Sequence, residues 1–504
     1  MTVIAADQAR PPLVLALDLG SSSVRAILMD ALGREVQGAV VQTKHTLRTT
    51  PDGGAEDWPD EMLDRLCAAI DSLLAAVSSQ QAAHIGAVGM SSFVGNVLGL
   101  DHENEPVTPL YAYADTRAAP DATHLRATLN EADIHDRVGA MLHASYLPAR
   151  LTWLARTQPS AYRQVRRWVA FGDYLYLKLF GRLATSLSVA SWTGLLNRRT
   201  LDWDEVLLGR LALSAEHLPP LVDADTAFTG LLPEYAARWP ALRSIPWYPA
   251  VGDGAAANLG SGCVAPDRVA LTIGTTGAMR VVVPEARKAQ TDPAVPTPLG
   301  LWIYRVDARR GLLGGALTEG GNLFAWMRRN LAPLENVEDQ LAAMQPDSHG
   351  LTMLPFLAGE RSPGWAENAQ ATITGLNLST TPLDLVRAGL EAIALRFALV
   401  YRMVNEAVPQ ARDVIASGGA ILASPTWMQI IADALNRPVT ACDEAEASSR
   451  GVALLALEAL GALRDLREAP AALGQTYFPD EARHERYAAA LERQRALYEA
   501  LVRR

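Results

Sequence analysis

A strand–turn–strand pattern that occurs twice constrains this chain more than any other feature of its sequence. The segment LVLALDLGSSSVRAILM (13–29) places an apolar run, a turn of small residues and a second apolar run in succession. The segment VALTIGTTGAMRVVV (269–283) repeats this order. Short apolar runs on either side of such a turn predict buried strands joined as a hairpin. The sequence therefore predicts two regions that open with the same hairpin.

The spacing of the two copies indicates a duplicated architecture. Aligning Gly20 with Gly274 separates them by half of the 504-residue chain. An ancient duplication that gave two similar domains would explain this offset, and the length accommodates two large domains. We place the boundary at 245–252, which predicts an N-terminal domain over 13–247 and a C-terminal domain over 248–504.

The segments between the two hairpins carry helical patterns. Apolar residues at helical spacing predict amphipathic helices at 59–77 and 382–405, and Thr381-Pro382 is a typical helix start. A charged amphipathic helix is expected at 480–504, and a proline-rich surface connection at 290–298. The pattern as a whole predicts a mixed α/β protein.

Composition excludes several classes of function. The net charge is −10, so the chain lacks the positive charge that binds nucleic acid or anionic lipid. Three cysteines at wide spacing form no disulfide framework, and the nine histidines lack the pairing of a zinc hydrolase. No apolar stretch approaches the ~18 residues of a membrane span, and we find no signal-peptide core. A cytoplasmic protein with a small-molecule ligand is expected.

The turns of the two hairpins are candidate phosphate sites. In Asp18–Arg25, small residues let backbone N–H groups approach phosphate oxygens, and the serine hydroxyls add further donors. Asp18, at the end of a strand, could hold Mg²⁺. A serine-rich turn without a ligand is the alternative. The second turn, Gly274–Gly277, repeats the chemistry, and two such turns across a cleft could hold a triphosphate and Mg²⁺.

A carboxylate between two glycines lies close to the expected domain boundary. The segment GDGAAAN (252–258) matches a dinucleotide-binding pattern, but the strand that follows does not end in the acidic residue which that fold needs. Asp253 could reach a substrate hydroxyl as a general base. A helix N-cap is an equally good interpretation from the local sequence.

Two further glycine-containing turns have open interpretations. Ser417–Ala420 lies between a short strand and a helix, where a nucleotide base or phosphate could approach the backbone closely. A tight turn without a ligand is the alternative. Gly359–Pro363 is interpreted as an exposed, salt-bridged turn, with a functional loop as the alternative.

Taken together, these segments resemble a known family. The chain from about 13 to 460 looks like the FGGY carbohydrate kinases of the superfamily that includes actin, hexokinase and the heat-shock chaperones. The motifs that carry the resemblance, in family order, are DLGSSSVR (18–25), GDGAAANLGSG (252–262), LTIGTTGAMRV (271–281), GERSPGW (359–365), SGGAILASPTWMQIIADALNRPV (417–439) and EASSRGVALLAL (446–457).

The resemblance implies an α/β fold with two actin-like (ribonuclease H-like) domains and a catalytic cleft between them. It implies ATP and Mg²⁺ in that cleft, with Asp253 as catalytic base and substrate contact and Asp18 as the carboxylate associated with the metal. The implied phosphate contacts are Ser21, Ser22, Arg25, Gly274, Thr275 and Thr276. The implied adenosine contacts are Gly321, Gly418, Gly419 and Ala423.

The implied sugar site departs from the family pattern. Tyr113 stands where a Trp is common, ahead of Asp115, and both are implied substrate contacts. Val94 and Gly95 replace a pair of residues that touch the sugar in many members, and Gly254 replaces a Gln found in some polyol kinases. The exact sugar is therefore left open by these positions.

The function expected from the resemblance is ATP-dependent phosphorylation of a small sugar, sugar acid or polyol. Segments 252–281 and 314–328 look most like the gluconate kinase branch, which makes gluconate the first substrate hypothesis and xylulose, or another pentulose or polyol, the alternative. An actin-like ATPase and a sugar- or nucleotide-binding module without transfer are hypotheses from other classes. The expected partners are ATP and the sugar, with a homodimer left open; nucleic acid and membranes are not expected.

Overall fold

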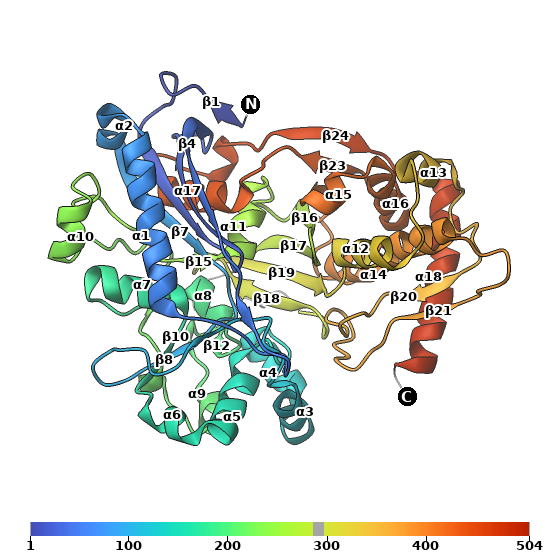
Figure 1. Ribbon diagram of the computed structural model, residues 1–504, viewed down its shortest axis with the longest axis horizontal. Helices are drawn as coiled ribbons and strands as arrows, with labels where there is room; N and C mark the ends of the chain where they lie inside the picture. Colours follow the sequence, from blue (N-terminus) through green and yellow to red (C-terminus); the bar gives the residue numbers. More distant parts are fainter. Residues whose placement is uncertain (1, 286–296, 503–504) are drawn as a thin grey trace.

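The computed structural model describes residues 2–285 and 297–502, which form two large sheets side by side with helices around them (Figure 1). Most of the proline-rich connection expected at 290–298 lies outside these residues. Within the described chain, no helix is both long enough and apolar enough to cross a membrane. All three cysteines are free and buried.

The first sheet grows from the first predicted hairpin. Its strand order is β1-β4-β3-β2-β7-β15. The central strand β2 is buried along its whole length, pairs antiparallel with β3 and pairs parallel with β7. The bounds are β1 (Val3–Ile4), β2 (Leu13–Leu19), β3 (Ser23–Met29), β4 (Glu35–Lys44), β7 (Ile85–Ser92) and β15 (Val251–Gly252).

The second sheet grows from the second hairpin in the same way. Its order is β18-β19-β17-β16-β22-β23-β24, where β16 pairs antiparallel with β17 and parallel with β22. The bounds are β16 (Arg268–Ile273), β17 (Gly277–Pro284), β18 (Trp302–Arg305), β19 (Arg310–Leu317), β22 (Asp413–Ser417), β23 (Val439–Cys442) and β24 (Leu473–Tyr477).

The two sheets share one topology. In each, two antiparallel steps lead from the central strand to one side, through β2, β3 and β4 or through β16, β17 and β19, and two parallel strands follow on the other side. The hairpin turns differ by one residue, because Gly20 N donates to Ser23 O, three residues on, at 2.9 Å, whereas Gly274 N donates to Thr276 O, two residues on, at 3.0 Å. The predicted hairpins are confirmed. Strand β15 of the first sheet lies just beyond residue 247, where we expected the boundary.

The expected long helices are present. They are α1 (Pro59–Ala76), α14 (Pro382–Ala407) and α18 (Glu481–Leu501), and Thr381 caps α14 through a capping box. The other helices are α2 (Ser79–Ala83), α3 (Ala119–Thr128), α4 (Glu131–Val138), α5 (Leu147–Thr157), α6 (Pro159–Gln164), α7 (Phe171–Phe180), α8 (Leu187–Ser191), α9 (Glu205–Arg210), α10 (Pro233–Arg238), α11 (Asp253–Gly260), α12 (Gly321–Asn330), α13 (Val337–Ala343), α15 (Gly419–Leu422), α16 (Pro425–Leu435) and α17 (Ala447–Ala459). Short strands outside the two large sheets are β5 (Arg48–Thr49), β6 (Ala55–Asp57), β8 (Leu98–Leu100), β9 (Leu110–Tyr111), β10 (Arg167–Val169), β11 (Thr185–Ser186), β12 (Leu196–Asn197), β13 (Asp202–Trp203), β14 (Leu221–Val222), β20 (Thr352–Leu354) and β21 (Thr372–Thr374).

A close crossing of α11 and α17 joins the two halves. A Cβ atom at Gly260 would lie 1.8 Å from the carbonyl oxygen of Ala447, and one at Gly451 would lie 1.9 Å from that of Ala256. Only glycine permits this approach at either position. Helix α17 comes from the second half of the sequence but also packs on β2 and β7 of the first sheet, so one hydrophobic core includes residues of both halves.

The crossing generates a stability prediction. Gly451→Ala places a methyl group against the backbone of α11, which must shift, and overpacking of this kind costs about 1–3 kcal/mol. We expect that decrease in the free energy of unfolding measured in urea. Gly209→Ala is the matched control, because Gly209 also lies in a helix but a Cβ atom there meets nothing within 4 Å. Equal stability of the two variants would contradict the close packing.

Candidate active site

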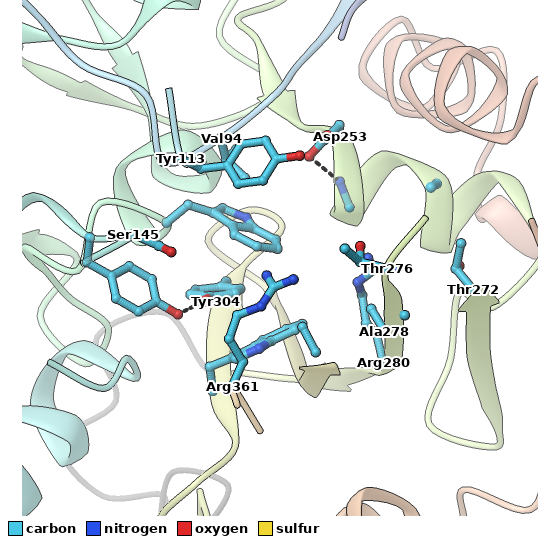
Figure 2. Close-up of a pocket in the computed structure, with 18 of the residues that line it drawn as sticks. Val94, Tyr113, Ser145, Asp253, Thr272, Thr276, Ala278, Arg280, Tyr304 and Arg361 are labelled. Carbon is cyan, nitrogen blue, oxygen red and sulfur yellow. Dashed lines mark hydrogen bonds between the residues drawn. The ribbon is translucent and has the colours of Figure 1, made fainter. Parts of the chain in front are cut away.

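A cavity of about 260 Å³ lies between the two halves (Figure 2). The first half contributes Val94, Gly95, Tyr113, Ser145, Tyr146 and Trp192 to its lining. The second half contributes Asp253, Gly254, Ala257, Thr272, Thr276, Gly277, Ala278, Arg280, Trp302, Tyr304, Ala316, Arg361, Trp365 and Ser448. A small polar ligand enclosed here would contact both halves at once.

Asp253 is the carboxylate that lines this cavity. It is the first residue of α11 and directly follows edge strand β15, while Gly252 takes the N-cap position. The helix-cap interpretation is therefore wrong. The Asp253 carboxylate accepts a hydrogen bond from the Gly254 N–H at 2.7 Å. Burial, and next the negative charge of Asp18, raise the pKa of Asp253 to about 6, although Arg280 opposes the shift. This carboxylate is therefore ionised at neutral pH but basic enough to accept a proton.

Asp18 is buried at the end of β2 with both oxygens bound. Ser91 Oγ donates to one oxygen at 2.5 Å and Arg25 donates to the other at 2.9 Å. Arg25 also lies 3.5 Å from a carboxylate oxygen of Glu446, so its charge is shared between two acidic groups. Since Asp18 raises the pKa of Asp253, the two carboxylates act on each other through space.

The two phosphate-type turns flank this pair of carboxylates. Ser22 and both threonines of the second turn, Thr275 and Thr276, are exposed. Thr276 lines the same cavity as Asp253, and Ser21 with Ser22 follows Asp18 closely in the chain. Their hydroxyls and backbone N–H groups are available to a ligand that enters between the halves.

The glycines predicted to border adenosine come together. The Gly321 N–H donates to Gly274 O at 2.7 Å, and a Cβ atom at Gly321 would lie 2.7 Å from that of Ala420. Gly418 has a φ of +101°, which favours glycine, and Ala423 ends the short helix that follows it. A Cβ atom at Gly419 would meet nothing within 4 Å. Gly321 and the segment 418–420 are thus adjacent, and a side chain at Gly419 would point into open space.

Two arginines in the cavity were not found by sequence reasoning. Arg280 on β17 is half-buried, and two of its nitrogens, Nε and Nη1, are buried and have no hydrogen-bond partner among the described residues. Burial lowers the pKa of Arg280, and the Asp253 carboxylate acts in the opposite direction. Arg361 enters the cavity from the side opposite Asp253 (Figure 2). The sequence signal that could have identified Arg280 is its position as the one charged residue within the apolar run AMRVVV (278–283).

The segment that carries Arg361 corrects an expectation. Gly359–Pro363 was expected to be an exposed turn, but Glu360 is 3% exposed and Ser362 is completely buried. Glu360 pairs with Arg396 of α14. The turn interpretation failed because the residues that bury this segment are distant in the sequence. The segment is a loop that delivers a cation to the cavity.

Stacked aromatic rings form one wall of the cavity. The centroids of Trp192 and Tyr304 are 3.8 Å apart, and those of Tyr304 and Trp302 are 4.4 Å apart. A Cβ atom at Gly254 would lie 3.2 Å from Trp192. The glycine that replaces a Gln here therefore leaves room for the indole ring.

The remaining predicted substrate residues have different positions. Tyr113 lines the cavity and is 41% exposed, and Figure 2 shows its hydroxyl directed toward Asp253. Val94 and Gly95 line the cavity without a polar side-chain atom. Asp115 is buried, pairs with Arg117 at 2.5 Å and is not part of the lining. Its contact with a sugar stays a prediction.

Comparison with known proteins identifies the architecture. Residues 13–260 match the N-terminal domain, and residues 269–460 the C-terminal domain, of the FGGY family of carbohydrate kinases. The chain belongs to this family. Both the predicted two-domain actin-like fold and the predicted enzyme class, a carbohydrate kinase, are confirmed. Carbohydrate kinases of this family use ATP.

Similar proteins differ in the sugar they are named for. The gluconokinase of Bacillus subtilis is 26% identical over 477 residues, which cover 92% of this chain and 91% of that enzyme. The crystal structure of a xylulose kinase from Lactobacillus acidophilus has a TM-score of 0.89 at 26% identity and covers 97% of this chain and 98% of its own. A gluconate kinase structure from the same organism has a TM-score of 0.88 with the same identity and coverage. The chain is thus a sugar kinase whose substrate these likenesses leave open.

The open space at Gly419 generates a prediction about nucleotide binding. Gly419→Val should weaken binding of a non-hydrolysable ATP analogue at least about tenfold, or about 1.4 kcal/mol, because the side chain fills the expected nucleotide space. The free energy of unfolding should change by less than about 1 kcal/mol. Calorimetric titration measures the affinity for the ATP analogue, and urea unfolding measures the free energy of unfolding. Gly209→Val controls for a branched residue in a helix. An unchanged affinity would place the nucleotide elsewhere.

Proposed function

We propose that this kinase transfers the γ-phosphoryl group of ATP to a hydroxyl of gluconate, with Asp253 as the general base. One observation carries the choice of gluconate over a neutral sugar. The cavity that contains Asp253 is also lined by the half-buried Arg280, whose buried Nε and Nη1 lack a hydrogen-bond partner in the described structure. A sugar acid can supply both a hydroxyl for the base and a carboxylate for the cation.

The proposed reaction is an in-line displacement at phosphorus. Asp253 accepts a hydrogen bond from the sugar hydroxyl, orients it and takes its proton as the oxygen attacks the γ-phosphorus of ATP. The bond from that phosphorus to the β-γ bridging oxygen breaks, and ADP leaves. The threonines of the second turn and the serines of the first would bind the phosphates. Most of the rate enhancement then comes from positioning and charge stabilisation.

The two cavity arginines complement an anionic sugar. Guanidinium groups bind carboxylates through charge-assisted hydrogen bonds that are often bidentate. A neutral ketose or glycerol offers the nitrogens of Arg280 only uncharged oxygens, which form weaker hydrogen bonds with a guanidinium than a carboxylate does. The gluconokinase among the similar proteins supports the same choice.

The acidic residues of the cleft fit a magnesium ion. Mg²⁺ in phosphate-binding sites is held by one or two carboxylates together with phosphate oxygens, and Asp18 and Asp253 lie close enough to influence each other's charge. We propose Asp18 as the carboxylate associated with the metal. When bound, the ion would neutralise charge on the phosphates of ATP.

Xylulose phosphorylation is the second candidate. The xylulose kinase structure from Lactobacillus acidophilus supports it as well as the gluconate kinase structure supports gluconate, since their TM-scores differ by only 0.01. A coupled assay of ADP release across gluconate, D-xylulose and glycerol decides between them. A preference for either neutral substrate of more than tenfold in kcat/KM would overturn the gluconate proposal and leave the kinase class intact.

The base assignment predicts a large and selective loss. Asp253→Asn keeps the shape of the side chain and its acceptor for the Gly254 N–H, so the melting temperature and ATP affinity should stay close to wild type. Removal of a positioned base should lower kcat about 10²- to 10⁴-fold. Single-turnover kinetics measure this. Retention of more than about a tenth of the wild-type rate would contradict the role.

The pH profile is the control for this variant. Because Asp253 must be ionised to accept a proton and its pKa is about 6, wild-type kcat at saturating gluconate should rise with pH up to about pH 7 and then level off. Below pH 6 it should fall about tenfold per unit. The residual activity of Asp253→Asn should lack this ascending limb.

The carboxylate assignment predicts a change in substrate preference. Arg280→Met should lower kcat/KM for gluconate about 10²- to 10³-fold, because a charge-assisted pair is lost from a buried site. Turnover of D-xylulose should change less than about fivefold, since a neutral sugar makes no such pair. Equal losses for both substrates would show that Arg280 only supports the shape of the cavity.

A further inference from the structure

A buried carboxylate lies between the two candidate substrate sites without a place in the proposed reaction. Glu319 follows strand β19 and immediately precedes Gly320 and Gly321, the start of α12. It is 2% exposed. Buried carboxylates are unfavourable unless their surroundings compensate the charge, so the groups around Glu319 indicate what it does.

The Glu319 carboxylate holds the loop that delivers Arg361. The Ala358 N–H donates to Glu319 Oε1 at 3.0 Å, and the backbone of Leu357 adds a second interaction. Arg361 follows three residues after Ala358 and donates back to Leu317 O at 3.3 Å. The carboxylate thus contacts one end of this loop while Arg361 extends from its middle into the cavity.

The backbone next to Glu319 packs against the second phosphate turn. A Cβ atom at Gly320 would lie 2.8 Å from the Thr276 backbone. The N–H groups of Gly321 and Asn322 donate to Gly274 O at 2.7 Å and Thr275 O at 3.1 Å. The segment 319–322 is therefore in contact with both the expected nucleotide side and the sugar side.

Arg361 is the positively charged group that compensates the negative charge of Glu319. The charged groups that line the small cavity beside Glu319 are Glu360, Arg361 and Arg396. Glu360 pairs with Arg396 and accepts a hydrogen bond from Tyr498 at 2.5 Å, so these two charges compensate each other. Arg361 acts on Glu319 electrostatically.

We propose that Glu319 is a positioning residue for Arg361, and that it shares the charge of this arginine with the carboxylate of a bound sugar acid. This inference rests on the proposed function, because it requires an anionic substrate. Glu319 and the substrate carboxylate are then two anions on one cation. Binding of the substrate carboxylate must therefore make Glu319 harder to ionise. Ionisation of Glu319 must in turn weaken binding of the substrate, because the coupling between two sites is reciprocal.

Proton uptake is the measurable consequence. Burial raises the pKa of Glu319 to about 7, so its carboxylate is already partly protonated near neutral pH. A second anion near Arg361 raises that pKa further. If the increase is one unit, gluconate binding at pH 7.5 takes up about half a proton. Affinity for gluconate should therefore decrease several-fold as the pH rises from 6.5 to 8.5.

Calorimetric titration tests this with the full-length protein. Gluconate is titrated at pH 7.5 in two buffers of different ionisation enthalpy, which gives the number of protons taken up. We expect Glu319 to contribute about half a proton in the wild type, and Glu319→Gln, which keeps the size and an oxygen acceptor for the Ala358 N–H, to lose that contribution. Glu319→Ala removes that acceptor too and should raise the KM for gluconate about tenfold, with little change in that for ATP.

Asp433→Asn is the matched control. Asp433 is a buried carboxylate of the same half with a pKa raised by burial, accepts a backbone N–H from Asp480 at 2.9 Å and does not line the cavity. Its variant should keep the wild-type proton uptake. If Glu319→Gln takes up as many protons as the wild type, this inference fails while gluconate remains the substrate. If the wild type binds no gluconate, the proposed function fails and this inference fails with it.

Discussion

The close crossing of α11 on α17 determines where the chemistry of this kinase can occur. Glycines at 260 and 451 let the two backbones touch, and this contact fixes the start of α11, where Asp253 lies. The start of α11 is at the same time the end of edge strand β15 in the first sheet. The proposed base is therefore held by both halves and lies in the cavity between them, rather than on either half alone.

Low polarity in that cavity makes its few charges interact strongly. Asp253, Arg280 and Arg361 lie among stacked aromatic rings and small residues, where charges are screened less than in water. The same burial that raises the pKa of Asp253 also lowers that of Arg280. A ligand that brings complementary charge would relieve both effects. The same charged groups of the cavity would then serve both substrate binding and catalysis.

The sequence predicted what local patterns determine. The hairpins, the helix that begins at Thr381 and the placement of Asp253 beside a glycine-rich turn all depend on residues close in the chain. It did not predict the burial of Glu360, because the partners that bury it, Arg396 and Tyr498, are distant in sequence. Arg280 was missed for a related reason. A lone arginine in a strand gives no local sign that its neighbours in space leave it unpaired.

The interleaved chain path has a consequence for how this protein becomes folded. Strand β15 and helix α17 lie on either side of the second hairpin in sequence, yet both complete the first half. The core on one face of the first sheet is incomplete until α17, made more than 400 residues into synthesis, has arrived, whereas the core on the other face consists of first-half residues alone. The nascent N-terminal half therefore leaves the ribosome with one apolar face uncovered. Because this face stays exposed until α17 emerges, we expect the first half to complete its folding only after most of the second half has been made.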